Sequence, residues 1–176
     1  GINGWIWALI ALDSKRYVVP EEAYHQRQDF IVEILKKQLA DGGFALSGNV
    51  SDPDITAMAV QALAPYYNSE IEYEYISEKI KETDEDGSKF FVKIKKNVRQ
   101  VIDESLAWLS SVQAEDGDFY SWGMQNVEST CQVVVALTAL GIDPLTDERF
   151  ITDSGNTLLD GIMKYRLDNG GFIHSF

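Results

Sequence analysis

The chain has 176 residues, of which 45% are hydrophobic and 24% are charged, a composition typical of one globular domain and not of a disordered chain. Acidic residues outnumber basic residues by 28 to 15, and the formal net charge of −13 would repel nucleic acid and anionic membrane surfaces. The longest apolar run, Trp5 to Leu12, is far shorter than the roughly 20 residues of a membrane-spanning helix, so we expect no direct membrane insertion.

Two kinds of helix are predicted to alternate along the chain. Inner helices are apolar nearly all round and rich in alanine, which is typical of helices enclosed on every side. Outer helices carry apolar side chains at the spacing of one helix face. In chain order we expect an inner helix at 5–12, an outer helix at 26–39, an inner helix at 56–64, an outer helix at 97–113, an inner helix at 130–140 and an outer helix at 156–166.

Local signals mark the second and third inner helices. Asp52 and Pro53 place a cap residue and a first-turn proline at the start of the second, so we expect Asp52 or Asp54 to cap that helix. Cys131 is the only cysteine, which excludes an internal disulfide. It lies in the third inner helix, where we expect a small core residue.

A different pattern separates the second inner helix from the outer helix that follows. Residues 71–75 alternate between acidic and apolar side chains, residues 89–95 favour strands, and residues 84–88 between them have turn chemistry. The sequence therefore predicts an inserted, charged β-hairpin over residues 69–95, with acidic side chains on one arm facing lysines on the other. A flexible charged loop is the alternative interpretation.

A short motif follows each outer helix. We call its copies the first corner (Gln38–Phe44, QLADGGF), the second corner (Gln113–Phe119, QAEDGDF) and the third corner (Arg166–Phe172, RLDNGGF). The spacing of the corners and the spacing of the inner helices both indicate a period of about 50 residues, interrupted once in the interval that holds the predicted hairpin.

An amphipathic helix, a glycine-aromatic corner and a buried alanine-rich helix in this order resemble the repeat of the terpenoid cyclase and protein prenyltransferase superfamily. The resemblance is closest to the prenyltransferase/squalene-oxidase-like repeat domains of Gram-positive bacterial surface proteins. It implies an all-α fold, an α/α toroid, here a partial ring of about three helix pairs with the β-hairpin inserted. Residues 1–176 would then be a single domain cut from a longer protein, which would be extracellular or cell-wall-associated.

The resemblance allows two kinds of chemistry to be examined residue by residue. Class II terpene cyclases protonate an alkene with the middle acid of an Asp-x-Asp-Asp-Thr-Ala motif, and the segment 52–57 keeps that acid as Asp54 but has Ile55 in place of the next Asp. Prenyltransferases bind zinc through Asp, Cys and His, but Asp118 and Ser129 stand where this chain would need Cys and His. We therefore expect no metal and no cofactor.

The resemblance also points to candidate ligand-binding residues at one mouth of the ring. The starts of the inner helices would lie together there, with aromatic side chains in the loop before the third. These candidates are Asn3, Asp54, Thr56, Trp122, Glu128 and Gln132. Packing between two helix layers would explain the same residues.

The function predicted from the sequence is a non-catalytic module of a secreted or cell-surface bacterial protein that binds an unknown small molecule or protein, and not nucleic acid. One alternative is a cyclase-like enzyme of class II with Asp54 as its general acid. The other is a small-molecule binding domain similar to the cobalamin carriers, which use a related fold purely for binding.

Overall fold

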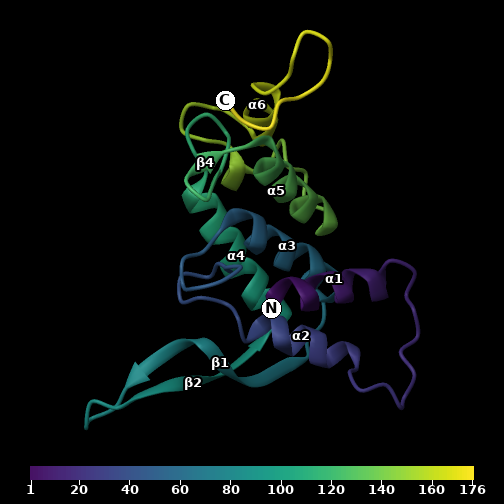
Figure 1. Ribbon diagram of the computed structural model, residues 1–176, viewed down its shortest axis with the longest axis vertical. Helices are drawn as coiled ribbons and strands as arrows, with labels where there is room; N and C mark the ends of the chain where they lie inside the picture. Colours follow the sequence, from purple (N-terminus) through teal and green to yellow (C-terminus); the bar gives the residue numbers. More distant parts are fainter.

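The computed structural model describes residues 1–176 and contains both helices and strands (Figure 1). The α-helices are α1 (Ile2–Asp13), α2 (Arg27–Leu35), α3 (Pro53–Leu63), α4 (Val98–Val112), α5 (Val127–Ala139) and α6 (Leu158–Met163), with short 3-10 helices η1 (Ala64–Tyr66) and η2 (Glu148–Phe150). The strands are β1 (Glu72–Thr83), β2 (Lys89–Asn97), β3 (Tyr120–Ser121) and β4 (Met124–Gln125). None of the helices combines the length and the apolar character that crossing a membrane requires.

Helix α3 lies at the centre of the helical part. It packs against α1 and α5, while α2 contacts α1, α4 contacts α3 and α6 contacts α5. The small side chains Ala57, Ala59 and Ala62 of α3 are fully buried, which lets the neighbouring helices approach closely. Helix α4 is amphipathic and buries one apolar face against this core, as its sequence pattern predicts.

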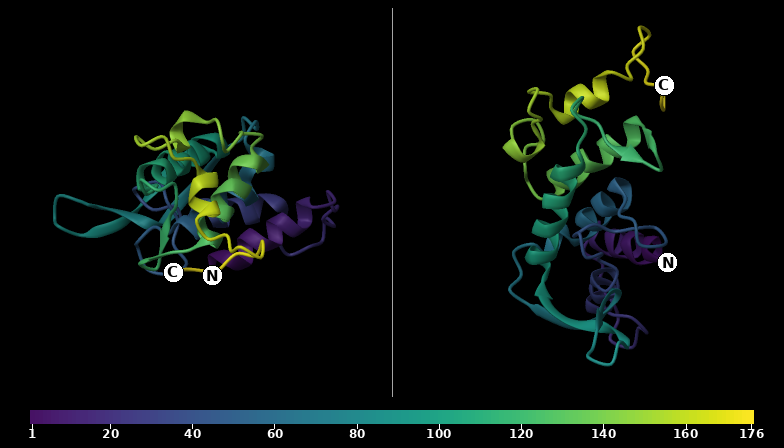
Figure 2. Two further views of the ribbon diagram at one scale, coloured as in Figure 1. Left: turned by 90° about the horizontal axis from the view of Figure 1, so that it is seen from above. Right: turned by 90° about the vertical axis from the view of Figure 1, so that its left-hand side faces the viewer.

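The predicted β-hairpin is present. Strands β1 and β2 pair antiparallel, and two lysines of β2 bind two glutamates of β1, Lys93 to Glu74 at 2.5 Å and Lys95 to Glu72 at 2.6 Å. The turn end of the hairpin extends away from the helices, as Figures 1 and 2 both show. At the other end, the alternation of β1 buries Tyr73 and Tyr75 in the main hydrophobic core.

The prediction of an all-α toroid is wrong. The chain is mixed, with 41% of residues in helices and 15% in strands. The physical reason lies partly in the hairpin, which is a part of the core through Tyr73 and Tyr75 instead of an insert on a helical ring. Helix α6 is also much shorter than the predicted segment 156–166, and the segment between α1 and α2 has no regular structure.

Candidate binding cleft

The first corner is fixed by one side-chain amide and one hydroxyl. The Gln38 amide donates to the carbonyl of Gly42 at 3.1 Å and to the carbonyl of Val101 on α4 at 3.2 Å. The Thr56 hydroxyl on α3 accepts from the Phe44 N–H at 2.9 Å and donates to the Phe44 carbonyl at 3.3 Å. Thr56, a predicted ligand-binding residue, is therefore buried and attaches the first corner to α3.

The second corner repeats the amide contacts. The Gln113 amide donates to the carbonyl of Gly117 at 3.3 Å and to the carbonyl of Phe150 at 3.2 Å. Gly42 and Gly117 both have a left-handed backbone, with φ of +93° and +85°. In each corner the amide thus satisfies a carbonyl of its own turn and one of a neighbouring element.

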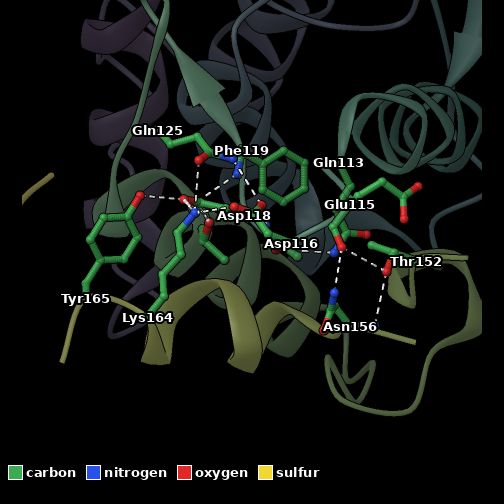
Figure 3. Close-up of polar contacts among 12 residues, drawn as sticks. Gln113, Glu115, Asp116, Asp118, Phe119, Gln125, Thr152, Asn156, Lys164 and Tyr165 are labelled. Atoms are coloured by element: carbon green, nitrogen blue, oxygen red, sulfur yellow. Dashed lines mark hydrogen bonds and ion pairs between the residues drawn. The ribbon is translucent and has the colours of Figure 1, made fainter. Parts of the chain in front are cut away.

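A buried carboxylate distinguishes the second corner (Figure 3). Asp118 Oδ1 accepts from the N–H of Phe119 at 2.7 Å and from the hydroxyl of Thr130 on α5, while Oδ2 accepts from the Tyr165 hydroxyl and from Lys164 Nζ at 2.8 Å. Burial, together with the bond to Asp118, raises the pKa of Tyr165 well above its ordinary value. The carboxylate therefore joins the second corner to α5 and to the end of α6.

A cleft of about 400 Å³ lies between the two loops that follow the first and second corners. One wall comes from residues 46–52, before α3, and the other from residues 120–123, in the β3–β4 hairpin. Its volume is within the range of about 300–1,000 Å³ that is typical of small-molecule sites. The lining residues are Leu46, Ser47, Gly48, Asn49, Val50, Ser51, Asp52, Tyr120, Trp122 and Gly123.

The aromatic wall of the cleft has an unusual backbone. Strands β3 and β4 are joined by the two residues Trp122 and Gly123, whose φ angles are +52° and +81°. Positive φ at both positions is the pattern of a type I′ turn, where Asn-Gly is the preferred pair. Trp122 is 77% exposed, so its backbone has a disfavoured conformation although its side chain is not buried.

Asp52 connects the cleft to the start of α3. Its Oδ1 caps the helix by accepting from the N–H groups of Asp54 at 3.0 Å and Ile55 at 3.2 Å. Its Oδ2 accepts from the hydroxyl of Ser121 at 2.7 Å, and the same hydroxyl lies 3.3 Å from Asp54 Oδ2. Asp52 is therefore the helix cap, and Ser121 attaches the aromatic hairpin to both acids.

The carboxyl group of Asp54 has a raised pKa. Burial raises its pKa, and the charges of Asp52 and Glu128 act in the same direction, while hydrogen bonding to Ser129 and Ser121 opposes the shift. Its Oδ1 is buried and accepts no hydrogen bond. Asp54 is not a lining residue of the cleft.

The other predicted site residues lie outside the cleft lining. Glu128 is exposed at the start of α5, and its carboxylate lies 2.7 Å from His174 Nδ1. The Gln132 amide donates to Gln61 Oε1 at 3.0 Å and thereby links α5 to α3. Asn3 on α1 is half-buried, and its side-chain oxygen has no partner.

Of the six predicted residues, the structure thus places Trp122 in the cleft and connects Asp54 to it through Ser121. Sequence reasoning missed the opposite wall, residues 46–51. The sequence does contain a signal for this wall. Residues 46–51 follow the first corner as residues 120–123 follow the second, so the two loops occupy corresponding places in the chain.

Acid catalysis would need a carboxyl group that keeps its proton and touches the substrate. The pKa of Asp54 is raised, which favours retention of a proton. However, its unpartnered oxygen is buried and the residue does not line the cleft. No group of three or more His, Cys, Asp or Glu side chains is arranged to hold a metal ion.

In comparisons with known proteins, no family model matches the chain and no curated protein matches its sequence.

Proposed function

We propose that the chain is a non-catalytic ligand-binding module and that its site is the cleft between residues 46–52 and 120–123. The observation that carries the proposal is Trp122, which lies exposed on the cleft with a φ of +52°. A left-handed backbone costs an ordinary residue roughly 1–2 kcal/mol. Because little of the indole is buried, packing does not offset this cost. The type I′ turn requires a positive φ at this position but not a tryptophan, and contact with a ligand supplies a reason for that residue.

We also propose that the module belongs to a secreted or cell-surface bacterial protein related to the terpenoid cyclase and prenyltransferase superfamily. The corners support this relationship, because each has an acidic or amide side chain that accepts from the backbone N–H two residues later. The three bonds are Gly43 N–H to Asp41 at 3.0 Å, Asp118 N–H to Asp116 at 3.2 Å and Gly171 N–H to Asn169 at 2.9 Å. The location outside the cell rests on the resemblance alone.

The decisive variant is Trp122→Asn. Asparagine is a preferred residue at the first position of a type I′ turn, so the β3–β4 hairpin keeps its fold while the cleft loses its indole. We expect the midpoint of urea unfolding to stay the same or to rise. Trp7→Ala is the matched control, because Trp7 is also exposed, at 51%, but lies on α1 away from the cleft.

Binding is measured by saturation-transfer NMR with a panel of small soluble probes: neutral oligosaccharides, quaternary ammonium ions, carboxylates and aromatic alcohols. At least one probe should bind to the unmodified protein and to Trp7→Ala, and its signal should disappear with Trp122→Asn. The proposal is wrong if no probe distinguishes Trp122→Asn from the other two proteins, or if only Trp7→Ala abolishes binding.

A further inference from the structure

The chemistry of the cleft identifies a class of ligand. Resting on the function proposed above, we propose that the cleft binds a neutral saccharide, with one face of a sugar ring against Trp122 and its hydroxyl groups toward residues 47–49. Three properties carry this assignment: the charge balance of the lining, the hydrogen-bonding groups that it leaves free, and its exposed aromatic rings.

The charge balance disfavours an anion. No lining residue is basic, and the chain as a whole has a formal net charge of −13. The ammonium group of Lys79 approaches the cleft loop, but it donates to the carbonyl of Gly48 at 2.6 Å. Lys79 is not a lining residue, so a phosphate or carboxylate ligand would find no cationic side chain in the lining of the cleft.

A cation is also poorly matched. Asp52 is the only charged lining residue, and its carboxylate already accepts from two backbone N–H groups and from the Ser121 hydroxyl. It also lies at the N-terminus of α3, where the helix dipole offsets its negative charge. The electrostatics of the cleft thus favour a ligand without net charge.

The free polar groups are neutral and mixed in kind. Ser47, Asn49 and Tyr120 line the cleft, and their side chains form no hydrogen bond with the rest of the chain. Together they offer both donors and acceptors, which suits a ligand rich in hydroxyl groups. The Ser51 hydroxyl, in contrast, is already bonded to Asp41 at 2.7 Å.

The aromatic side chains supply the apolar part of the surface. Trp122 and Tyr120 are 77% and 57% exposed. The face of an aromatic ring carries partial negative charge, and the C–H groups on one side of a sugar ring carry partial positive charge because of the attached oxygens. A sugar ring can therefore cover an indole face while its hydroxyl groups bond to neighbouring amides and hydroxyls. A purely apolar ligand would leave those polar groups unpaired.

The test uses purified hexasaccharides with different linkages, namely cellohexaose, maltohexaose, chitohexaose and mannohexaose, with tetramethylammonium and inorganic phosphate as charged probes. Affinity is measured by titration calorimetry and contacts by saturation-transfer NMR. We expect at least one hexasaccharide to bind, with the strongest transfer to ring C–H protons. Trp122→Asn and Asn49→Ala should each weaken that binding at least tenfold, while Trp7→Ala leaves it unchanged.

The outcomes separate this inference from the proposed function. Binding of tetramethylammonium or phosphate that depends on Trp122, with no binding of any hexasaccharide, overturns the saccharide assignment and leaves the cleft a binding site. Saccharide binding that is unaffected by both cleft variants places the sugar elsewhere and also overturns the assignment. If no probe of any class binds in a manner that depends on Trp122, both proposals fail.

Discussion

The first and second corners have the same hydrogen-bonded turn, but they differ at the sixth of their seven positions, which is buried in the second corner, and in the loop that follows. Where the first corner has Gly43, the second has Asp118. A Cβ atom at Gly43 would lie 2.4 Å from Ser51 Oγ, because the loop after the first corner folds back over it. After the second corner the chain forms the β3–β4 hairpin instead, and the Asp118 side chain is buried between α5 and α6.

This difference shows how one local motif can serve two purposes. The first corner has glycine at its sixth position, where a Cβ would collide with the Ser51 side chain of the loop that closes over it. The second corner uses the same position for a carboxylate that joins neighbouring elements. Since the two loops leave their corners differently, they face each other across open space, and that space is the cleft. The candidate site thus exists because the two corners are not identical.

The largest expected effect comes from removing the carboxylate that distinguishes the second corner. Asp118→Ala leaves three buried donors without an acceptor, namely the N–H of Phe119 and the hydroxyls of Thr130 and Tyr165. At about 1 kcal/mol or more for each, the free energy of unfolding should fall by at least about 3 kcal/mol. Urea denaturation at neutral pH measures this loss.

Asp116→Ala is the control for an exposed carboxylate of the same corner. Asp116 also binds Lys164, at 2.6 Å, and accepts from the N–H of Asp118 at 3.2 Å, but its side chain is exposed, so water can replace it as a partner and the loss should be smaller than for Asp118→Ala. Equal losses in Asp116→Ala and Asp118→Ala would show that the buried carboxylate has no special role in the second corner.

The sequence predicted the local features of the fold better than their arrangement. The Asp52 cap, the amphipathic α4 and the β-hairpin are each specified by neighbouring residues, and each was predicted. The predicted toroid is wrong because Tyr73 and Tyr75 are buried in the core, so the hairpin is part of that core. Whether a hairpin packs in this way depends on contacts with helices that are distant in the sequence. Alternation shows that one face of a strand is buried but not what buries it.

The apolar composition of α5 led to a wrong prediction of its burial. Helix α5 was expected to be enclosed on every side, yet Cys131 is exposed and Val135 is 40% exposed. Alanine, valine and cysteine are compatible with both environments, so the pattern could not distinguish them. Of the cleft residues, the sequence singled out only Trp122. Ser47 and Asn49 gave no signal, because they line the cleft only through a loop some 70 residues away that faces them.

The second prediction compares glycines at the same position of two corners. Gly117 and Gly170 both have φ of +85°, so alanine at either position incurs the same backbone cost of roughly 1–2 kcal/mol. A Cβ at Gly117 would also lie 2.1 Å from the Thr157 carbonyl oxygen, whereas a Cβ at Gly170 meets nothing within 4 Å. Gly117→Ala should therefore destabilise the protein by about 1–3 kcal/mol more than Gly170→Ala.

Thermal or urea unfolding of the two variants gives this difference directly. The backbone cost of alanine at positive φ is the same in both variants and therefore cancels. A Gly117→Ala variant no less stable than Gly170→Ala would mean that the second corner can move away from α6. In that case the close packing of this corner, which helps to position the β3–β4 hairpin, would not be required for stability.

The smallest effect concerns the acids that follow the two corners, Asp54 on α3 and Glu128 on α5. Because the pKa of Asp54 is raised in the folded protein, the folded state holds this proton at pH values where the unfolded chain has lost it. The contribution of Asp54 to the free energy of unfolding should therefore fall as the pH rises above about 4, where an aspartate of the unfolded chain ionises. Asp54→Asn removes this contribution.

Asp54→Asn should thus be more stable than the unmodified protein at pH 7, by less than about 1 kcal/mol because the group is only partly shielded from solvent. The advantage should disappear near pH 3, where both proteins are neutral at this position. Glu128→Gln is the matched control: its side chain is exposed, and removing its charge takes away one contribution to the raised pKa of Asp54. When Asp54→Asn is made in the Glu128→Gln protein, its pH-dependent advantage should be smaller but still present. If Asp54→Asn is less stable at pH 7 than at pH 3, relative to the unmodified protein, then ionised Asp54 stabilises the start of α3 and burial is not the dominant influence on this acid.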